Sequence, residues 1–170
     1  YNMMSGGGCQ VPKWALSAIY RCYGQYSQHE VLGIAKKFRE KDLAIGTIGL
    51  EPGWMTQAYS CSFVWSQERY PEYKSMLKEL RSMNFHINLW EHAFVHPSSP
   101  LYDQLVEYSG NYAVWGGCVP DFSIEQARTI FTDFHKQFVA DGIDGFKLDE
   151  CDGSDLANGW SFPNMAEFPS

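Results

Sequence analysis

Apolar residues recur at intervals of three and four in several stretches of the chain, a spacing typical of helices with one buried face. The clearest begins at Ser27, which with Glu30 fits the capping box S-x-x-E, and it continues through Phe38. A second capping box, S-x-x-Q from Ser123, predicts a helix that continues through Val139. A third helix is predicted from near Pro71, with an apolar face of Tyr73, Met76, Leu77 and Leu80, and a weaker one over Leu101 to Tyr108.

Short apolar runs between these helices predict buried strands. Turn residues such as Asp141-Gly142 precede the runs. The predicted strands are Trp14–Tyr20, Leu43–Leu50, Phe85–Leu89 and Gly145–Leu148. Strand and helix alternate, which is typical of parallel β-α units with both faces of the sheet covered. We therefore expect the strands to be parallel neighbours in chain order, with the helices on the outside.

The residues at the strand ends favour a closed barrel over an open sheet. The dinucleotide-binding open sheet needs G-x-G-x-x-G after its first strand, and residues 20–26 lack it. Polar and aromatic residues instead follow the predicted strands, where a (β/α)8 barrel places its active site. A complete barrel takes about 250 residues. The predicted fold class is therefore α/β, a (β/α)8 TIM barrel of which residues 1–170 hold the first four or so β-α units, with no second domain visible.

Composition excludes several classes of partner. Acidic side chains outnumber basic ones, 20 to 13, and the formal net charge is −7. Without a cluster of Lys and Arg, binding to nucleic acid or to an anionic membrane surface is not expected. No apolar stretch approaches the roughly 20 residues of a membrane span. No signal peptide is visible in residues 1–8, and the compartment stays open.

Cysteine and histidine usage gives no sign of a metal or another cofactor. The 5 cysteines form no CxxC pair, and their odd number argues against a disulfide framework. We expect most of them to be small buried side chains. His92 and His96 follow Trp90 and could line a pocket, but no His, Asp or Glu set has the spacing of metal ligands.

The segment around Lys147 and Asp149 carries the strongest chemical pattern. Residues two apart in a strand share a face, so these two side chains should project together. An ammonium beside a carboxylate favours the ionised acid and keeps it available as a nucleophile. A structural ion pair inside a barrel is the alternative interpretation. Asp144, just before this strand, is interpreted as a turn residue, and Asp121 as a residue that caps its own loop.

Five motifs in the expected order give the chain a resemblance to the family 31 glycoside hydrolases, retaining α-glycosidases built on a (β/α)8 barrel. The resemblance runs from about Val11 to Asp152. Its motifs are Pro12-Lys13-Trp14-Ala15-Leu16, similar to P-x-W-A-L-G; Ile48 to Trp54, similar to I-x-L-D-x-x-W; Asn88-Leu89-Trp90; Pro120-Asp121-Phe122-Ser123 with Ala127-Arg128; and Gly142 to Asp149, similar to the nucleophile strand.

The resemblance implies a role for individual residues. Asp149 falls on the catalytic nucleophile, Glu51 on the carboxylate that holds sugar hydroxyls, and Trp90 on the aromatic wall of the same subsite. Trp54 and Lys147 are expected to contact substrate as well. The family usually has Asp where Glu51 stands, and Asp152 takes the place of a family Glu.

The implied function is retaining hydrolysis of α-glycosides in oligosaccharides, α-glucosidase- or α-xylosidase-like, without a cofactor. Such an enzyme needs a second carboxylate as acid/base, about 5–5.5 Å from the nucleophile. We expect it on the remainder of the barrel, beyond Ser170, so that residues 1–170 alone are inactive. The alternatives are an α-galactosidase of families 27 or 36, which share the K-x-D strand, and a non-catalytic carbohydrate-binding barrel.

Overall fold

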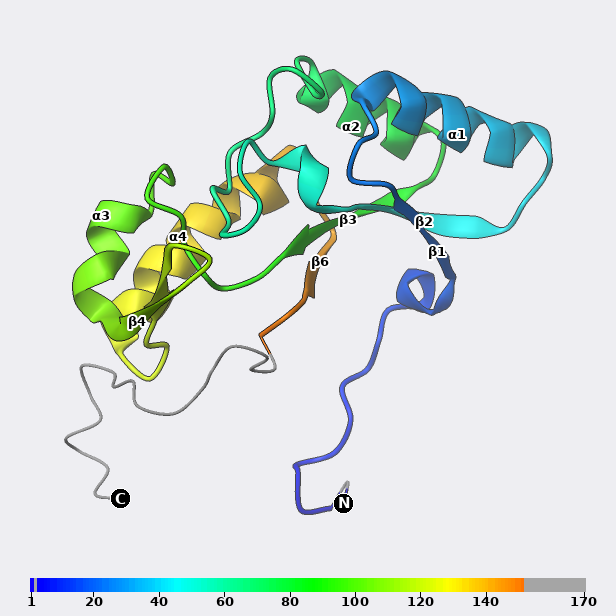
Figure 1. Cartoon of the computed structure of the whole chain (residues 1–170). Coiled ribbons are helices and arrows are strands. Elements are labelled where there is room, and N and C mark those ends of the chain that lie inside the picture. The colour runs from blue at the N-terminus through cyan, green and yellow to red at the C-terminus, as the bar shows by residue number, and fades with distance from the viewer. Residues whose placement is uncertain (2, 152–170) are drawn as a thin grey trace.

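The computed structural model describes residue 1 and residues 3–151. Within that part of the chain, four strands form one parallel sheet in the order β1-β2-β3-β6 (Figure 1). They are β1 (Ala18–Cys22), β2 (Ile45–Leu50), β3 (His86–Glu91) and β6 (Gly145–Leu148). The predicted parallel arrangement in chain order is confirmed, and it is the start of a (β/α)8 barrel.

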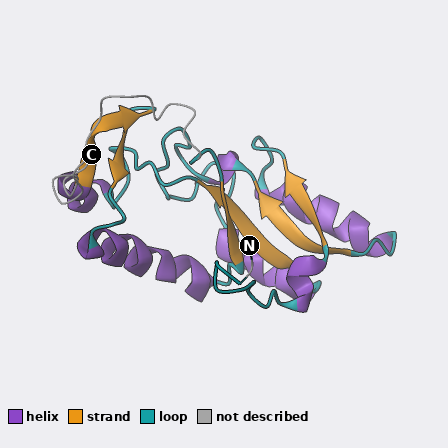
Figure 2. Ribbon diagram, turned by 90° about the horizontal axis from the view of Figure 1, so that it is seen from below, coloured by secondary structure: helices purple, strands orange, loops and turns teal. Residues whose placement is uncertain are grey.

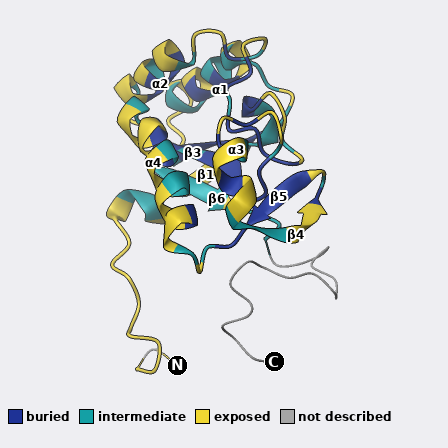
Figure 3. Ribbon diagram, turned by 90° about the vertical axis from the view of Figure 1, so that its left-hand side faces the viewer, coloured by how far each residue is buried: buried dark blue, intermediate teal, exposed yellow. Residues whose placement is uncertain are grey.

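Three longer helices pack on the sheet. They are α1 (Gln28–Glu40), α2 (Tyr73–Ser82) and α4 (Glu125–Asp141), and α1 lies beside α2 (Figure 1). Their outer faces are exposed, and buried residues line the side that faces the strands (Figure 3). The capping box at Ser27 is present, and Met76, Leu77 and Leu80 of α2 are buried as predicted. No helix within the described residues is long and apolar enough to cross a membrane.

Two predicted boundaries are wrong for local reasons. Pro12 caps a 3₁₀ helix, η1 (Lys13–Leu16), so the first strand begins at Ala18 and not at Trp14. The second capping box does not form, because the Ser123 hydroxyl donates to Asp121 Oδ1 at 2.6 Å and Ile124 becomes the N-cap of α4. The Asp121 loop cap is thereby confirmed.

One antiparallel hairpin was not expected from the sequence. It consists of β4 (Ser109–Val114) and β5 (Gly117–Pro120), and it lies apart from the parallel sheet (Figure 2). Its turn residues Trp115 and Gly116 both have positive φ, 48° and 73°, as tight two-residue hairpin turns require. The predicted weak helix before it is two short pieces, α3 (Tyr102–Leu105) and the 3₁₀ helix η3 (Val106–Tyr108).

The hairpin is joined to the sheet end through short bridges. Val95 pairs with both Cys61 and Cys118, so the chain after β3, the loop after β2 and the hairpin are held together. Another 3₁₀ helix, η2 (Pro52–Trp54), begins that loop. The described residues thus gather three loops at the carboxyl end of the strands. Cys22, Cys61 and Cys118 are buried, whereas Cys9 is exposed and Cys151 half-buried.

Candidate active site

The carboxyl ends of β2, β3 and β6 bring Glu51, Trp90, Lys147 and Asp149 together. Lys147 Nζ lies 2.9 Å from Asp149 Oδ2 and 3.7 Å from Glu51 Oε2. Both lysine and aspartate side chains keep more than a third of their surface exposed. One ammonium group therefore faces two carboxylates at a solvent-accessible edge of the sheet.

Asp149 is held by β3 as well as by its own strand. Trp90 Nε1 donates to Asp149 Oδ2 at 2.8 Å, and the backbone N–H of Asp149 donates to the Glu91 carbonyl at 2.8 Å. The backbone N–H of Glu150 donates to Asp149 Oδ1 at 3.1 Å. The hydrogen bond from Lys147, followed by that from Trp90, lowers the pKa of Asp149 below its usual value. The side chain is ionised and fixed, as a carboxylate nucleophile needs to be.

Glu51 is oriented by Arg21, a residue that lies outside the five sequence motifs. Arg21 Nε donates to Glu51 Oε1 at 2.5 Å, and another guanidinium nitrogen donates to the side-chain oxygen of Asn88. Arg21 and Asn88 flank Gly49 in the sheet, and a Cβ on Gly49 would lie 2.4 Å from the Arg21 guanidinium. The missing side chain of Gly49 lets Arg21 lie across β2 and reach β3.

The two tryptophans have structural contacts that differ from the expected roles. Trp54 is fully buried, packs against Trp65 and Phe138, and donates its indole N–H to the Trp90 carbonyl at 2.8 Å. The expected contact of Trp54 with substrate is therefore corrected: it supports Trp90 from the core. Trp90 itself is 1% exposed, and its polar edge rather than its face reaches Asp149.

Tyr59 supplies the exposed aromatic surface that was expected of Trp90. It is 44% exposed, in the loop that follows β2, and its ring centroid lies 5.4 Å from Trp90 and 5.0 Å from Trp115. His92 lies beneath it, with centroids 5.9 Å apart. Burial lowers the pKa of His92 to about 4, so it is neutral near pH 7. His92 is thus a core residue of the loop cluster, and it does not line an open pocket.

The remaining polar candidates have structural partners or lie elsewhere. Asp144 accepts from the Ile87 N–H at 2.9 Å and from Arg81 at 2.9 Å, which fixes the start of β6. His96 Nδ1 pairs with the Ser98 hydroxyl at 2.7 Å. Asp152 lies outside the described residues. Among the residues that are described, no group of three or more His, Cys, Asp or Glu could hold a metal ion.

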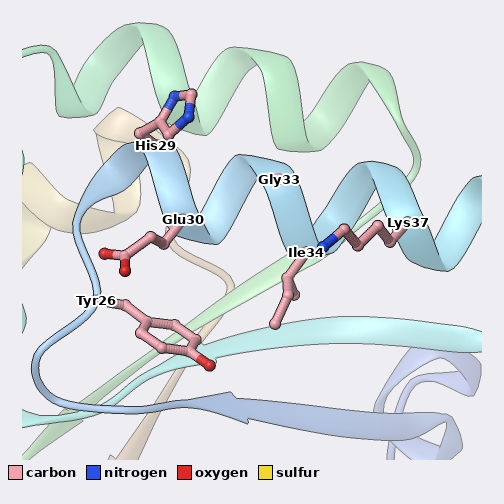
Figure 4. Close-up of a pocket in the computed structure, with 6 residues that line it drawn as sticks. All are labelled: Tyr26, His29, Glu30, Gly33, Ile34 and Lys37. Carbon is pink, nitrogen blue, oxygen red and sulfur yellow. The ribbon is translucent and has the colours of Figure 1, made fainter.

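The surface at Asp149 is hollowed. A depression of about 400 Å³ is lined by Leu148, Asp149, Glu150 and Cys151. Another, of about 330 Å³, lies beside α1 and is lined by Tyr26, His29, Glu30, Gly33, Ile34 and Lys37 (Figure 4). Figure 4 shows Ile34 pointing from α1 toward the underlying strands. This second depression therefore belongs to the outer helical layer of the fold. Of these two depressions among the described residues, the one at Asp149 is bordered by a member of the Lys147 network.

Comparison with known proteins supports the pattern at these strand ends. The sequence model described as the TIM-barrel domain of glycosyl hydrolases family 31 matches residues 9–168. An alpha-glucosidase of Saccharolobus solfataricus is 24% identical over 169 residues, 92% of this chain and 24% of that protein. An alpha-xylosidase of the same organism is 24% identical over 151 residues, 88% of this chain and 20% of that protein. The chain spans about a quarter or less of the length of these relatives.

Solved structures show the same fold. A family 31 alpha-xylosidase from Xanthomonas citri has a TM-score of 0.69 at 18% identity, over 82% of this chain and 17% of that chain. A family 31 dextranase of Flavobacterium johnsoniae, complexed with glucose, has a TM-score of 0.67 at 24% identity, over 81% of this chain and 19% of its own. A family 36 alpha-galactosidase from Geobacillus stearothermophilus has a TM-score of 0.63 at 17% identity, over 78% and 21%. Because the family model covers nearly the whole sequence, this chain belongs to glycosyl hydrolase family 31, as part of its TIM-barrel domain.

Proposed function

We propose that these residues are part of a retaining α-glycoside hydrolase that acts on oligosaccharides or simple glycosides, in the manner of an α-glucosidase or α-xylosidase. The observation that carries the proposal is the Asp149 carboxylate, held between Lys147 Nζ and Trp90 Nε1 at 2.9 and 2.8 Å. The match to the family 31 barrel and the names of its relatives support this class of substrate.

The proposed mechanism begins with attack of Asp149 on the anomeric carbon of the sugar. The bond from that carbon to the leaving-group oxygen breaks, and the oxygen takes a proton from an acid/base carboxylate. A water molecule, deprotonated by the same acid/base group, then releases the sugar from Asp149 with net retention. We propose that the acid/base group lies on a later strand of the barrel, beyond Ser170, so that the rest of the barrel is a necessary partner.

Glu51 and Lys147 are proposed to bind the sugar. Glu51 faces Arg21 and Lys147 with its two oxygens, and this holds the carboxylate in one orientation. A fixed carboxylate can accept hydrogen bonds from two neighbouring sugar hydroxyls without losing conformational entropy on binding. The exposed part of Lys147 can donate to a third.

The test of Asp149 uses the complete enzyme and a mechanism-based fluoroglycoside, followed by peptide mass spectrometry. We expect the label on Asp149, and Asp149→Ala should lose activity by orders of magnitude while still binding substrate, because no neighbouring group can form the same bond. Asp133→Ala is the matched control, since Asp133 pairs with Lys136 at 2.6 Å on the exposed surface of α4.

Two results would contradict this assignment. One is a label on Glu150 or Asp152 in place of Asp149. The other is near-full turnover by the Asp149→Ala variant. A wild-type protein that binds oligosaccharide without hydrolysing it would favour the non-catalytic barrel.

A further inference from the structure

Tyr59 is a rigid aromatic surface at the edge of the proposed active site. Nearly half of the side chain is exposed, yet its ring is supported by the rings of Trp90, His92 and Trp115. Trp90 lies in β3, His92 follows directly after that strand, and Trp115 lies in the turn between β4 and β5. An aromatic ring fixed in this way loses little conformational freedom when a ligand packs on it.

Glu150 carries an unsatisfied polar atom next to the nucleophile. Its Oε2 is buried and has no hydrogen-bond partner within the described residues. Burial of an unpaired carboxylate oxygen is unfavourable unless a ligand or another group completes it. Strand alternation from the sequence would put Glu150 on the face opposite to Asp149. Its φ of 54° turns the chain at this residue, so that alternation no longer applies.

Tyr59 and Glu150 lie close enough to interact. Burial, together with the neighbouring carboxylate of Glu150, raises the pKa of Tyr59 to about 12. The Tyr59 hydroxyl therefore stays protonated and can donate a hydrogen bond near neutral pH. The negative charges of Asp149 and Glu51 also raise the pKa of Tyr59, in the same direction as Glu150. Glu150 lines the same depression as Asp149.

We propose that Tyr59 and Glu150 contact the substrate: the Tyr59 ring packs on the apolar face of a glycosyl unit, and Glu150 accepts a hydrogen bond from one of its hydroxyls. Sugar rings suit this pair because their C–H faces are apolar and their edges carry hydroxyl groups. The inference rests on the proposed function, since it assigns the ligand of the same site. It makes Tyr59, and not the buried Trp90, the aromatic wall.

Kinetics of the complete enzyme with aryl α-glucosides and α-xylosides test the assignment. Tyr59→Leu should raise KM by about tenfold or more with a smaller change in kcat, whereas Tyr59→Phe should keep most of the affinity because the ring remains. Glu150→Gln should raise KM roughly tenfold, because a hydrogen bond to a charged acceptor is weakened. Its melting temperature should change little, because Glu150 Oε2 has no hydrogen-bond partner within the described residues and glutamine keeps an oxygen that can accept from Tyr59. Glu107→Gln is the control, since Glu107 forms a side-chain hydrogen bond with Tyr108 on the surface, away from the site.

Fluoroglycoside labelling separates this inference from the proposed function. If the wild type is labelled on Asp149 but Tyr59→Leu and Glu150→Gln keep KM within twofold, the assignment of Tyr59 and Glu150 is overturned and the proposed function stands. If the wild type is not labelled, titration of the wild type and both variants with an aryl α-glucoside decides whether Tyr59 and Glu150 contact the ligand. Loss of binding in both variants then supports the contacts without catalysis, and unchanged binding overturns them.

Discussion

Substitution of Lys147 by methionine would remove the cation from the proposed site and keep most of the side-chain length. The ammonium lies 2.9 Å from Asp149 and 3.7 Å from Glu51, so two carboxylates lose their shared partner. Lys147 is the largest cause of the lowered pKa of Asp149. We therefore expect the pKa of Asp149 to rise in Lys147→Met, while the hydrogen bond from Trp90 limits the change.

The size of the rise follows from the exposure of the pair. At 2.9 Å in bulk water, two unit charges attract by about 1.4 kcal/mol. The side chains of Lys147 and Asp149 are 40% and 37% exposed, so solvent screening is strong and the net interaction is about 0.5–1 kcal/mol. That energy corresponds to a rise of less than about one pKa unit. Asp149 therefore stays ionised at pH 7 in the variant.

The assay is the pH dependence of kcat/KM in the complete enzyme, which reports the ionisation of the free enzyme. The nucleophile must be ionised, so activity is present above its pKa and lost as the pH falls through it. The acid limb of Lys147→Met should move to higher pH by roughly 0.4–0.7 unit. Any lost sugar contact should lower the plateau instead. An acid limb that stays in place, or moves to lower pH, would refute the electrostatic role, and Lys136→Met serves as the exposed control.

Two further substitutions test the packing that supports the site in the complete enzyme. Gly53→Ala should lower the melting temperature, with a loss of about 1–3 kcal/mol in stability, because its Cβ would stand 1.5 Å from the Gly24 carbonyl oxygen. Gly33→Ala in α1 is the control and should not lower it, because a Cβ there would meet nothing within 4 Å beyond its own helix backbone. Equal melting temperatures for the two variants would contradict the argument. His135→Ala should cost about 3–5 kcal/mol in chemical denaturation, because it leaves the buried Glu91 carboxylate without its partner at 3.1 Å. Glu91→Gln should cost less, because its amide oxygen can still pair with His135 Nε2, and a larger loss there would count against this contact.

The sequence predicts elements whose signals are local. The Ser27 capping box, the apolar faces of α1 and α2, and the strand order are present because propensity and burial agree there. The second capping box failed because Asp121 competed for the Ser123 hydroxyl, and the first strand shifted because Pro12 begins a helical turn. The predicted helix continues through Val139 as expected, but Val139 itself is 59% exposed.

The candidate site also contains some residues that the sequence predicts and others that it does not. Lys147 and Asp149 were predictable because alternation along one strand puts them together. Arg21 was missed because the strand was expected to end at Tyr20, which left Arg21 outside it. Tyr59 was missed because a single aromatic residue in a loop has no periodic pattern, and its partners come from three separate segments. Trp54 carried the expected motif, but only the packing shows that it is buried.

The division between strand ends and loops also bears on how this active site can change. The ionic network of Arg21, Glu51 and Lys147 is anchored on the sheet, whereas Tyr59 and Trp115 lie on a loop and a hairpin turn. If the proposed function holds, substitutions in those two loops can alter the recognised sugar while leaving the proposed nucleophile Asp149 in position. A library that varies the loop after β2 and the β4–β5 turn should therefore yield altered preference more often than inactive protein, and one that varies the strand ends should do the reverse.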